Sequence, residues 1–299
     1  MTSSQHHQTR IGCIGLGTMG APIARRLQQN GYALTLYARR PEVFKGDLAD
    51  LIENGATTAA TPADLAGEVD VILVNVMAGA DSRDVLLGRD DAVATSGREG
   101  LIILDHSTID PLDAQSIHHD LNKYGHHYID APVSGGSIGA EAGTLVTMMG
   151  GNSDVMNSVM PILECYTASR LEMGEAGTGQ VAKLCNQIAQ VVTIQGISEA
   201  MSFAETLGAD KKKVFDVMSS GFAASRMLEL LGPKMVGGDF TPLMKSKLLD
   251  KDIDIALTSS KEAGLDLPAL QLVRQAIGKM QEKGWHDEDI SSLFRLVRK

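Results

Sequence analysis

The chain has 299 residues, and its 27 Lys and Arg against 37 Asp and Glu give a formal net charge of −10. This length predicts about two domains. The acidic balance argues against nucleic acid as a partner, since phosphate backbones bind clustered basic surfaces. No apolar run reaches the ~18–20 residues that span a bilayer, and the three cysteines form no CxxC pair. We therefore expect a cytoplasmic protein with no membrane partner, no disulfide framework and no bound metal.

Residues 1–9 form a polar stretch without the apolar segment of a secretory signal, and we expect a flexible tail. From residue 10 to 174, short apolar runs alternate with helical stretches. The runs, expected to be buried strands, are Ile11–Ile14, Ala33–Tyr37, Val69–Val76, Leu101–Leu104, Tyr128–Ile129 and Leu145–Met149. Crossover helices fit between the first four, which predicts an α/β domain with a mostly parallel sheet covered on both faces.

The character of the chain changes after Gly174, where a glycine-rich bend precedes a long helical pattern from Gln180 to Leu207. Five further helical segments follow, at Lys211–Ser219, Met227–Met235, Met244–Ala263, Pro268–Lys283 and Glu288–Val297. Residues 175–299 are therefore predicted to form an all-α domain that begins with a long interdomain helix.

A phosphate-binding loop is predicted directly after the first strand, where Gly15, Gly17 and Gly20 form a GxGxxG pattern that opens a helix. The first glycine permits a tight turn, the second a close approach to pyrophosphate, and the third close packing of helix on strand. The helix N-terminus then offers unpaired N–H groups and a positive dipole end to the phosphates. We predict a Rossmann-type dinucleotide site over residues 10–174 that includes Leu16, Thr18 and Met19. A glycine-rich turn in an unrelated α/β fold is the alternative.

The end of the second predicted strand carries Arg39 and Arg40, where an NAD site usually has an acid that binds the ribose hydroxyls. A guanidinium suits a 2′-phosphate through its charge and its bidentate geometry. We therefore predict NADP as the preferred cofactor, with NAD as the alternative. Two solvated surface arginines are the simpler interpretation.

Two further segments carry groups that suit chemistry. Ser134-Gly135-Gly136 offers a hydroxyl and backbone N–H groups to an anion such as a carboxylate, or forms an ordinary tight turn. Lys183 stands in an apolar stretch of the long helix, with Asn186 and Gln187 one turn further on. It is either a boundary residue that extends its ammonium into solvent or a functional ammonium in a cleft.

The remaining candidates carry less weight. The pairs His118-His119 and His126-His127 have neighbouring side chains that face different ways, and we expect them at the surface. His106 follows the fourth strand, and a single histidine at such a position more often has a structural role. By pattern alone, Lys251 and the charged residues around it form a solvated helix face.

Four motifs, in this order, resemble the β-hydroxyacid dehydrogenases, which include 3-hydroxyisobutyrate dehydrogenase and tartronate semialdehyde reductase and are related to 6-phosphogluconate dehydrogenase. They lie at Gly15–Pro22, Asp130–Gly136, Gly177–Asn186 and Lys251–Ile253, and the resemblance extends over residues 11 to about 290. Ser107-Thr108 also resembles the family's Ser-Thr after the fourth strand.

The resemblance implies roles for these residues. Lys183 would be the catalytic acid/base, and Asn186 would orient the substrate hydroxyl or carbonyl. The substrate would be held by Ser134, Gly135, Gly136 and Gln187. Besides the glycine-rich loop and the two arginines, the cofactor would contact Val76, Met77, Thr108 and Lys251.

The chain departs from the family pattern in three places. Gln187 stands where a second asparagine is usual, and Val76-Met77 where Leu-Pro is frequent. Gln190 replaces the glutamic acid of 6-phosphogluconate dehydrogenase, which disfavours oxidative decarboxylation. Imine reductases share the architecture but typically lack the lysine, so Lys183 argues against that activity.

We therefore expect an NADP-preferring oxidoreductase that transfers hydride between nicotinamide and a small 3-hydroxy acid or its semialdehyde. Tartronate semialdehyde, 3-hydroxyisobutyrate, glyoxylate and succinic semialdehyde represent the substrate class. The resemblance also implies a carboxylate-bearing substrate and a homodimer or homotetramer, with residues 175–299 serving substrate binding and oligomerisation. The alternatives are a non-catalytic dinucleotide-binding sensor or interaction protein, and an imine reductase.

Overall fold

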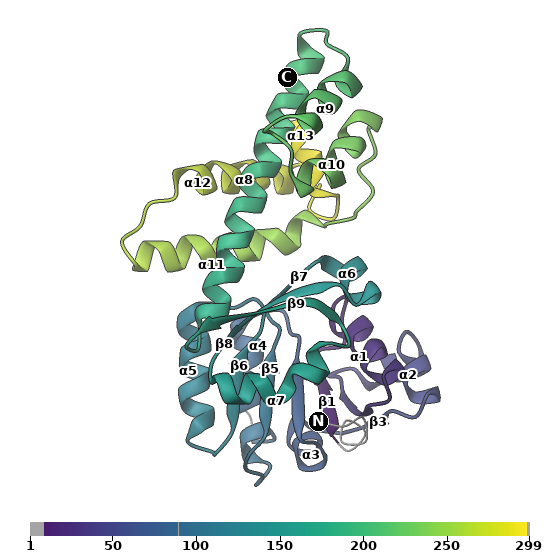
Figure 1. Ribbon diagram of the computed structural model, residues 1–299, viewed down its shortest axis with the longest axis vertical. Helices are drawn as coiled ribbons and strands as arrows, with labels where there is room; N and C mark the ends of the chain where they lie inside the picture. Colours follow the sequence, from purple (N-terminus) through teal and green to yellow (C-terminus); the bar gives the residue numbers. More distant parts are fainter. Residues whose placement is uncertain (1–8, 89, 298–299) are drawn as a thin grey trace. The chain divides into compact units, whose positions relative to one another are not determined.

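The computed structural model describes residues 9–88 and 90–297, without the side chain of Leu248. Its contacts divide the chain into two compact units, with the division between Lys183 and Leu184. The first is an α/β unit and the second is helical (Figure 1). Of the predicted tail, only Thr9 lies within the described residues. The domain boundary predicted near residue 174 stays a prediction.

The first unit is built on one sheet, whose described strands are β1 (Arg10–Ile14), β2 (Ala33–Tyr37), β3 (Thr57–Thr58), β4 (Val71–Val74), β5 (Ile102–Asp105), β6 (His127–Asp130), β7 (Val133–Ser134), β8 (Leu145–Gly150) and β9 (Thr167–Gly174). Their order is β3-β2-β1-β4-β5-β6-β8-β7, with β9 beside β8. The strands from β3 to β6 are parallel, and β8 is antiparallel to β6 and β7. The carboxyl ends of β1, β2, β4, β5 and β6 therefore share one edge. Strand β1 lies between β2 and β4, where the strand order reverses.

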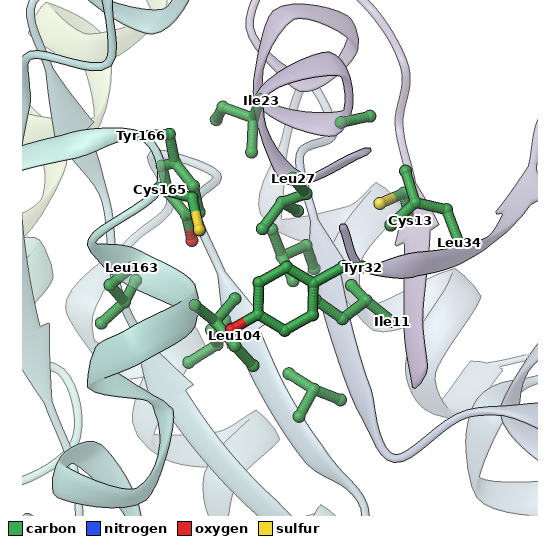
Figure 2. Close-up of a cluster of buried hydrophobic side chains, with 14 of the residues drawn as sticks. Ile11, Cys13, Ile23, Leu27, Tyr32, Leu34, Leu104, Leu163, Cys165 and Tyr166 are labelled. Atoms are coloured by element: carbon green, nitrogen blue, oxygen red, sulfur yellow. The ribbon is translucent and has the colours of Figure 1, made fainter. Parts of the chain in front are cut away.

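Helices cover both faces of this sheet, and alternate strand residues point to opposite faces. In β4, Val71 and Leu73 pack on one face, while Ile72 and Val74 pack on the other. Figure 2 shows the first of these two cores, where Leu27 and Tyr32 lie beside Ile11 and Leu104. The helices of the first core are α1 (Gly20–Gln29), α2 (Ala49–Glu53), α6 (Gly136–Ala142) and α7 (Ser153–Leu163). The second face carries α3 (Pro62–Glu68) and α5 (Pro111–Asn122), with α4 (Gly79–Arg83) and a π-helical turn at Asp84–Gly88 following β4.

The second unit continues the long helix α8 (Thr178–Thr206), which begins in the first unit. Its other helices are α9 (Lys211–Ser220), α10 (Arg226–Gly237), α11 (Ser246–Glu262), α12 (Pro268–Glu282) and α13 (Leu293–Leu296). They enclose a separate apolar core around Val191, Leu231, Ile277 and Phe294. Asp210 and Ser225 cap the N-termini of α9 and α10 by accepting backbone N–H groups.

The predicted fold class is confirmed, and the differences have local causes. The last predicted helix, Glu288–Val297, is instead a 3₁₀ turn at Ile290–Ser292 followed by α13. Asp289 starts this turn, because its carboxylate accepts the N–H group of Ser291. Three strands were not predicted. Strands β3 and β7 have only two residues each. Strand β9 carries charged and exposed side chains, so it has no apolar run that would mark it as a strand.

Candidate active site

The glycine-rich loop after β1 has the geometry that its three glycines predict. Gly15 has a φ of +87°, and a Cβ there would lie 2.2 Å from the carbonyl oxygen of Asn75. A Cβ on Gly20 would lie 2.1 Å from the carbonyl oxygen of Gly15. At Gly17 nothing lies within 4 Å of the Cβ position. Helix α1 begins at Gly20 with no side chain capping it. Open space beside Gly17 and an uncapped helix N-terminus fit a pyrophosphate group.

The loops after β4 and β5 are joined to each other beside this glycine-rich loop. The N–H group of Val76 donates to Ser107 Oγ at 3.0 Å, and the N–H group of Ser107 donates to Asp105 Oδ1 at 2.9 Å. Burial raises the pKa of Asp105, which also accepts the Tyr128 hydroxyl at 3.0 Å. The structure thus brings Val76 and the segment before Thr108 to the same strand edge. The Met77 side chain is exposed there.

The two arginines after β2 lie at this edge and are exposed. Arg39 Nη1 forms an ion pair with Asp81 Oδ1 of α4 at 3.4 Å. Because β1 separates β2 from β4 in the sheet, this pair joins segments from the two sides of β1. Arg39 is therefore positioned near the predicted dinucleotide loop, with the carboxylate of Asp81 beside it.

Lys183 is buried, with only 7% of its surface exposed. Its Nζ donates a hydrogen bond of 2.9 Å to the carbonyl oxygen of Val133 on β7. The ammonium group therefore contacts the residue directly before Ser134, which is predicted to bind a carboxylate. Gly135 and Gly136, with φ values of +130° and +63°, turn the chain into α6 and are exposed. The structure places Lys183 inside the first unit rather than extended into solvent.

Asp130, at the end of β6, holds the start of α8 in place. Its Oδ1 accepts the N–H group of Gly177 at 2.7 Å, and its Oδ2 accepts that of Gln180 at 2.9 Å. The side chain is fully buried. A carboxylate at this position caps the helix that carries Lys183 and interacts favourably with its dipole. Desolvation nevertheless raises the pKa of Asp130 to about 7, against the lowering effect of these two hydrogen bonds.

Gln180 links the same helix to the loop after β5. Its Nε2 donates to the carbonyl oxygen of Ser107 at 2.8 Å, and its Oε1 accepts the N–H group of Ile109 at 3.1 Å. The amide thus bonds to both neighbours of Thr108. Sequence reasoning missed Asp130 and Gln180 as organising residues. A signal was available, because Asp130 directly follows the apolar run Tyr128–Ile129 and Gln180 lies within the motif Gly177–Asn186.

Three predicted site residues lie in the second unit. Asn186 Nδ2 donates to Gln187 Oε1 at 3.1 Å, and Gln187 Nε2 donates to Asp252 Oδ2 at 2.7 Å. Lys251 Nζ lies 3.4 Å from Asp252 Oδ1. Asp252 is buried, so the solvated helix face expected from the pattern around Lys251 is wrong at this residue. The predicted cofactor contact of Lys251 stays a prediction.

Two of the histidines considered from the sequence, His106 and His126, are buried. His106 is buried, with Nδ1 2.6 Å from the Ala131 carbonyl oxygen and Nε2 2.9 Å from the Tyr166 hydroxyl. Burial lowers its pKa to about 4, so it serves as a neutral structural residue. His126 is also buried, and neither ring nitrogen has a hydrogen-bond partner. The expected surface position of His126 is therefore wrong.

A polar cavity of about 420 Å³ lies elsewhere in the first unit, lined by His118, Asn122, His127, Asn152, Asp154 and Glu175 among others. It contains none of the predicted site residues. Over the part of the chain that the structure describes, no cluster of His, Cys, Asp or Glu has the geometry to hold a metal ion. Among the same residues, no helix combines the length and apolar character needed to cross a membrane.

Two family models together match almost the whole chain. Residues 10–177 match the NAD binding domain of 6-phosphogluconate dehydrogenase. Residues 177–297 match the NAD-binding domain of NADP-dependent 3-hydroxyisobutyrate dehydrogenase. The two matches divide at the start of α8.

Whole-chain relatives agree with these matches. The chain is 35% identical over 289 residues to 2-hydroxy-3-oxopropionate reductase of Escherichia coli, covering 96% of this chain and 97% of that protein. It also resembles the solved structure of Mycobacterium tuberculosis 3-hydroxyisobutyrate dehydrogenase with L-serine. That match has a TM-score of 0.89 and 28% identity, covering 97% and 99% of the two chains.

An imine reductase from Pseudomonas is more distant, with a TM-score of 0.64 and 20% identity over 96% of this chain and 98% of that one. This likeness shows a shared fold only. The glycine-rich loop, the buried Lys183 beside Ser134 and the whole-chain matches agree with one another. The chain belongs to the β-hydroxyacid dehydrogenase family, the NAD(P)-dependent oxidoreductases that act on the CH–OH group of hydroxy acids.

Proposed function

We propose that this protein is an NADP-preferring dehydrogenase or reductase of small 3-hydroxy acids and their semialdehydes, with Lys183 as its acid/base. The observation that carries the proposal is the buried ammonium group of Lys183, bonded to the Val133 carbonyl oxygen directly before Ser134. A proton donor and an anion-binding turn thus adjoin each other at the carboxyl edge of the sheet. A substrate with a carboxylate close to its reacting carbon fits this arrangement.

The carboxylate of the substrate would bind at Ser134, Gly135 and Gly136. The Ser134 hydroxyl would donate one hydrogen bond to it, and the backbone of the turn would offer N–H groups. This segment contains no acidic residue, and the nearby ammonium group adds positive potential. The similar Mycobacterium tuberculosis enzyme was solved with L-serine, a 3-hydroxy acid with a carboxylate, which supports a carboxylate-bearing substrate.

Lys183 would manage the proton of the reacting oxygen. In reduction, the carbonyl carbon gains a hydride, the carbonyl electron pair moves to oxygen, and Lys183 Nζ delivers a proton to that oxygen. In oxidation, the neutral amine of Lys183 takes the hydroxyl proton while the hydride leaves the carbon. The hydrogen bond to the Val133 carbonyl oxygen orients the Nζ group for both directions. Asn186, three residues further along α8, would orient the substrate oxygen.

The nicotinamide cofactor supplies or accepts the hydride when it is bound. The open space beside Gly17 and the N-terminus of α1 would hold its pyrophosphate. Val76, Met77 and Thr108 would form its contacts nearer the substrate. Gln180 fixes both neighbours of Thr108, so it keeps this loop in register with the helix that carries Lys183.

The preference for NADP rests on Arg39 and Arg40, which take the place of the acid that usually follows β2 in an NAD site. The match of residues 177–297 to the family model of NADP-dependent 3-hydroxyisobutyrate dehydrogenase supports it. NAD remains the alternative cofactor.

The helical unit would serve substrate selection and assembly into a homodimer or homotetramer. Large apolar side chains are exposed at Phe203 on α8, at Leu207 in the turn that follows it, and at Val217 on α9. Exposed apolar surface of this kind favours self-association. The three free cysteines suit a reducing compartment, and we place the protein in the cytoplasm.

The test is oxidation of NADPH and NADH with tartronate semialdehyde, succinic semialdehyde, glyoxylate and methylmalonate semialdehyde. Turnover of at least one of them is expected, with NADPH used better than NADH. A protein that binds both cofactors but turns over none of these aldehydes would be a dinucleotide sensor. Turnover of cyclic imines, but of none of these aldehydes, would instead indicate an imine reductase.

A further inference from the structure

Arg39, the proposed ligand of the 2′-phosphate, forms an ion pair with Asp81, which has no role in the proposed function. Arg39 follows β2, and Asp81 stands in α4, which follows β4. The Nη1 and Oδ1 atoms are 3.4 Å apart, and 68% of the Arg39 side chain and 29% of the Asp81 side chain are exposed. Both residues belong to the first unit, so the pair is part of one compact body.

The place of this pair in the sheet gives it a connection with the cofactor. Strand β1, with its glycine-rich loop, lies between β2 and β4. In open α/β sheets, a dinucleotide binds outside the carboxyl ends of the strands at the point where the strand order reverses. Arg39 and Asp81 approach each other from the two sides of that point.

Asp81 therefore acts on the same group that a 2′-phosphate needs. A phosphate monoester carries about −1.5 to −2 charges at neutral pH, and a carboxylate close to Arg39 competes with it for the guanidinium group. The same carboxylate can accept a hydrogen bond from a ribose 2′-hydroxyl, as the acid at the end of β2 does in NAD sites. An acid from α4 can thus supply the acceptor that the sequence after β2 lacks.

We propose that Asp81 is a second determinant of cofactor choice, one that opposes the 2′-phosphate and supports NAD through its pairing with Arg39. This inference rests on the proposed function, because it takes the dinucleotide to lie at this strand edge. It makes the enzyme less selective for NADP than its two arginines alone would suggest.

The experiment measures the binding of two cofactor fragments, adenosine 2′,5′-bisphosphate and ADP, to the full chain by calorimetry. The variants are Asp81→Asn, Arg39→Ala and the double variant. Glu53→Gln is the control, because it also removes one exposed carboxylate, at the end of α2 before β3, on the amino side of that strand. The fragments carry no reacting group, so the readout does not depend on catalysis.

The Asp81→Asn variant should bind adenosine 2′,5′-bisphosphate about 3- to 10-fold more tightly, the range expected on removing a partly exposed like charge from a doubly charged ligand. Its affinity for ADP should fall, because the variant loses the carboxylate that accepts the ribose 2′-hydroxyl. In the Arg39→Ala background most of this gain should disappear. The Glu53→Gln control should match the wild type for both fragments.

Three results would overturn the proposal. Equal affinity of wild type and Asp81→Asn for the bisphosphate would remove Asp81 from cofactor choice, and weaker binding would make it a support for Arg39 instead. A gain that persists in full without Arg39 would contradict the role of the ion pair. Wild-type protein that binds neither fragment would contradict the proposed function itself, which separates the two failures.

Discussion

The start of helix α8 and the end of strand β2 belong to the same unit but are built in opposite ways. At α8, the side chains of Asp130 and Gln180 make four hydrogen bonds of 2.7–3.1 Å to backbone groups, and all of them are buried. At β2, Arg39 is exposed and has an ion pair of 3.4 Å with Asp81. A buried polar group left without its partner costs about 1–3 kcal/mol, whereas an exposed ion pair contributes about 0–1 kcal/mol.

This difference teaches which part of the site is fixed and which part is adjustable. Lys183, proposed for the chemistry, stands on a helix whose start is fixed by buried hydrogen bonds, so moving it would cost stability. The groups proposed for cofactor choice lie where a single substitution changes selectivity with little effect on folding. We therefore expect large losses of activity or stability around α8 and modest shifts of preference around β2.

The largest effect is expected for Lys183→Ala. Removing a positioned acid/base should lower kcat by about 10²–10⁴, while the dissociation constant of NADPH changes little. Cys185→Ala, two residues along the same helix and exposed, is the control and should retain wild-type kcat. Steady-state kinetics with the best semialdehyde and NADPH titrations measure both quantities. Near-wild-type turnover of Lys183→Ala would remove this residue from the mechanism.

The second-largest effect is expected in the free energy of unfolding, which should depend on pH through Asp130. Burial raises its pKa to about 7 in the folded state, whereas an unfolded aspartate has a pKa of about 3.9. Between these two pKa values, Asp130 is therefore protonated in the folded chain and ionised in the unfolded chain. The contribution of this residue to stability is fully present below about pH 4 and is lost as the pH rises toward 7.

Asp130→Asn keeps the size of the side chain and removes this titration. The free energy of unfolding of the wild type, relative to Asp130→Asn, should fall by about 2–4 kcal/mol between pH 4 and pH 7 and then stay level. Urea unfolding at pH 4.5, 5.5, 6.5 and 7.5 gives the difference directly. A difference that is constant, or that rises with pH, would mean that Asp130 is a charged carboxylate throughout this range.

A smaller effect is expected at the end of β2. Arg39→Ala should lower the NADPH over NADH preference in kcat/KM by about 10- to 100-fold, because a charge-assisted hydrogen bond contributes about 1.5–3 kcal/mol. Arg40→Ala is the matched comparison, since it removes the same charge at the next residue. Equal changes for the two cofactors in Arg39→Ala, with a selective loss in Arg40→Ala, would transfer the phosphate contact to Arg40.

Much of the fold could be predicted from the sequence, because buried strands and long helices leave strong patterns. The strand Ala33–Tyr37 was predicted with its observed bounds, and α8 within two residues at its start and one at its end. Strand β9 was not predicted, since a strand with exposed charged side chains has no apolar run to mark it. The 3₁₀ turn near the C-terminus depends on the acceptor position of Asp289, which only the structure provides.

The candidate site was predictable in part, and for a physical reason. The backbone geometry of the phosphate loop can be predicted from its glycines, because only glycine tolerates the close contacts at Gly15 and Gly20. Lys183 was ambiguous, since the sequence does not show which carbonyl group its ammonium contacts. The Arg39 and Asp81 pair joins residues 42 positions apart, so its existence follows from the strand order rather than from any local pattern.

The central claim is that Lys183 and the Ser134–Gly136 turn together form a site for a carboxylate-bearing substrate. The most direct measurement compares kcat/KM for succinic semialdehyde and butyraldehyde, and for tartronate semialdehyde and glyceraldehyde. Loss of two charged hydrogen bonds, each of about 1.5–3 kcal/mol, should leave the neutral aldehyde at least ~100-fold behind in the better-used pair. Comparable values of kcat/KM within that pair would contradict the carboxylate site and favour a general aldehyde reductase.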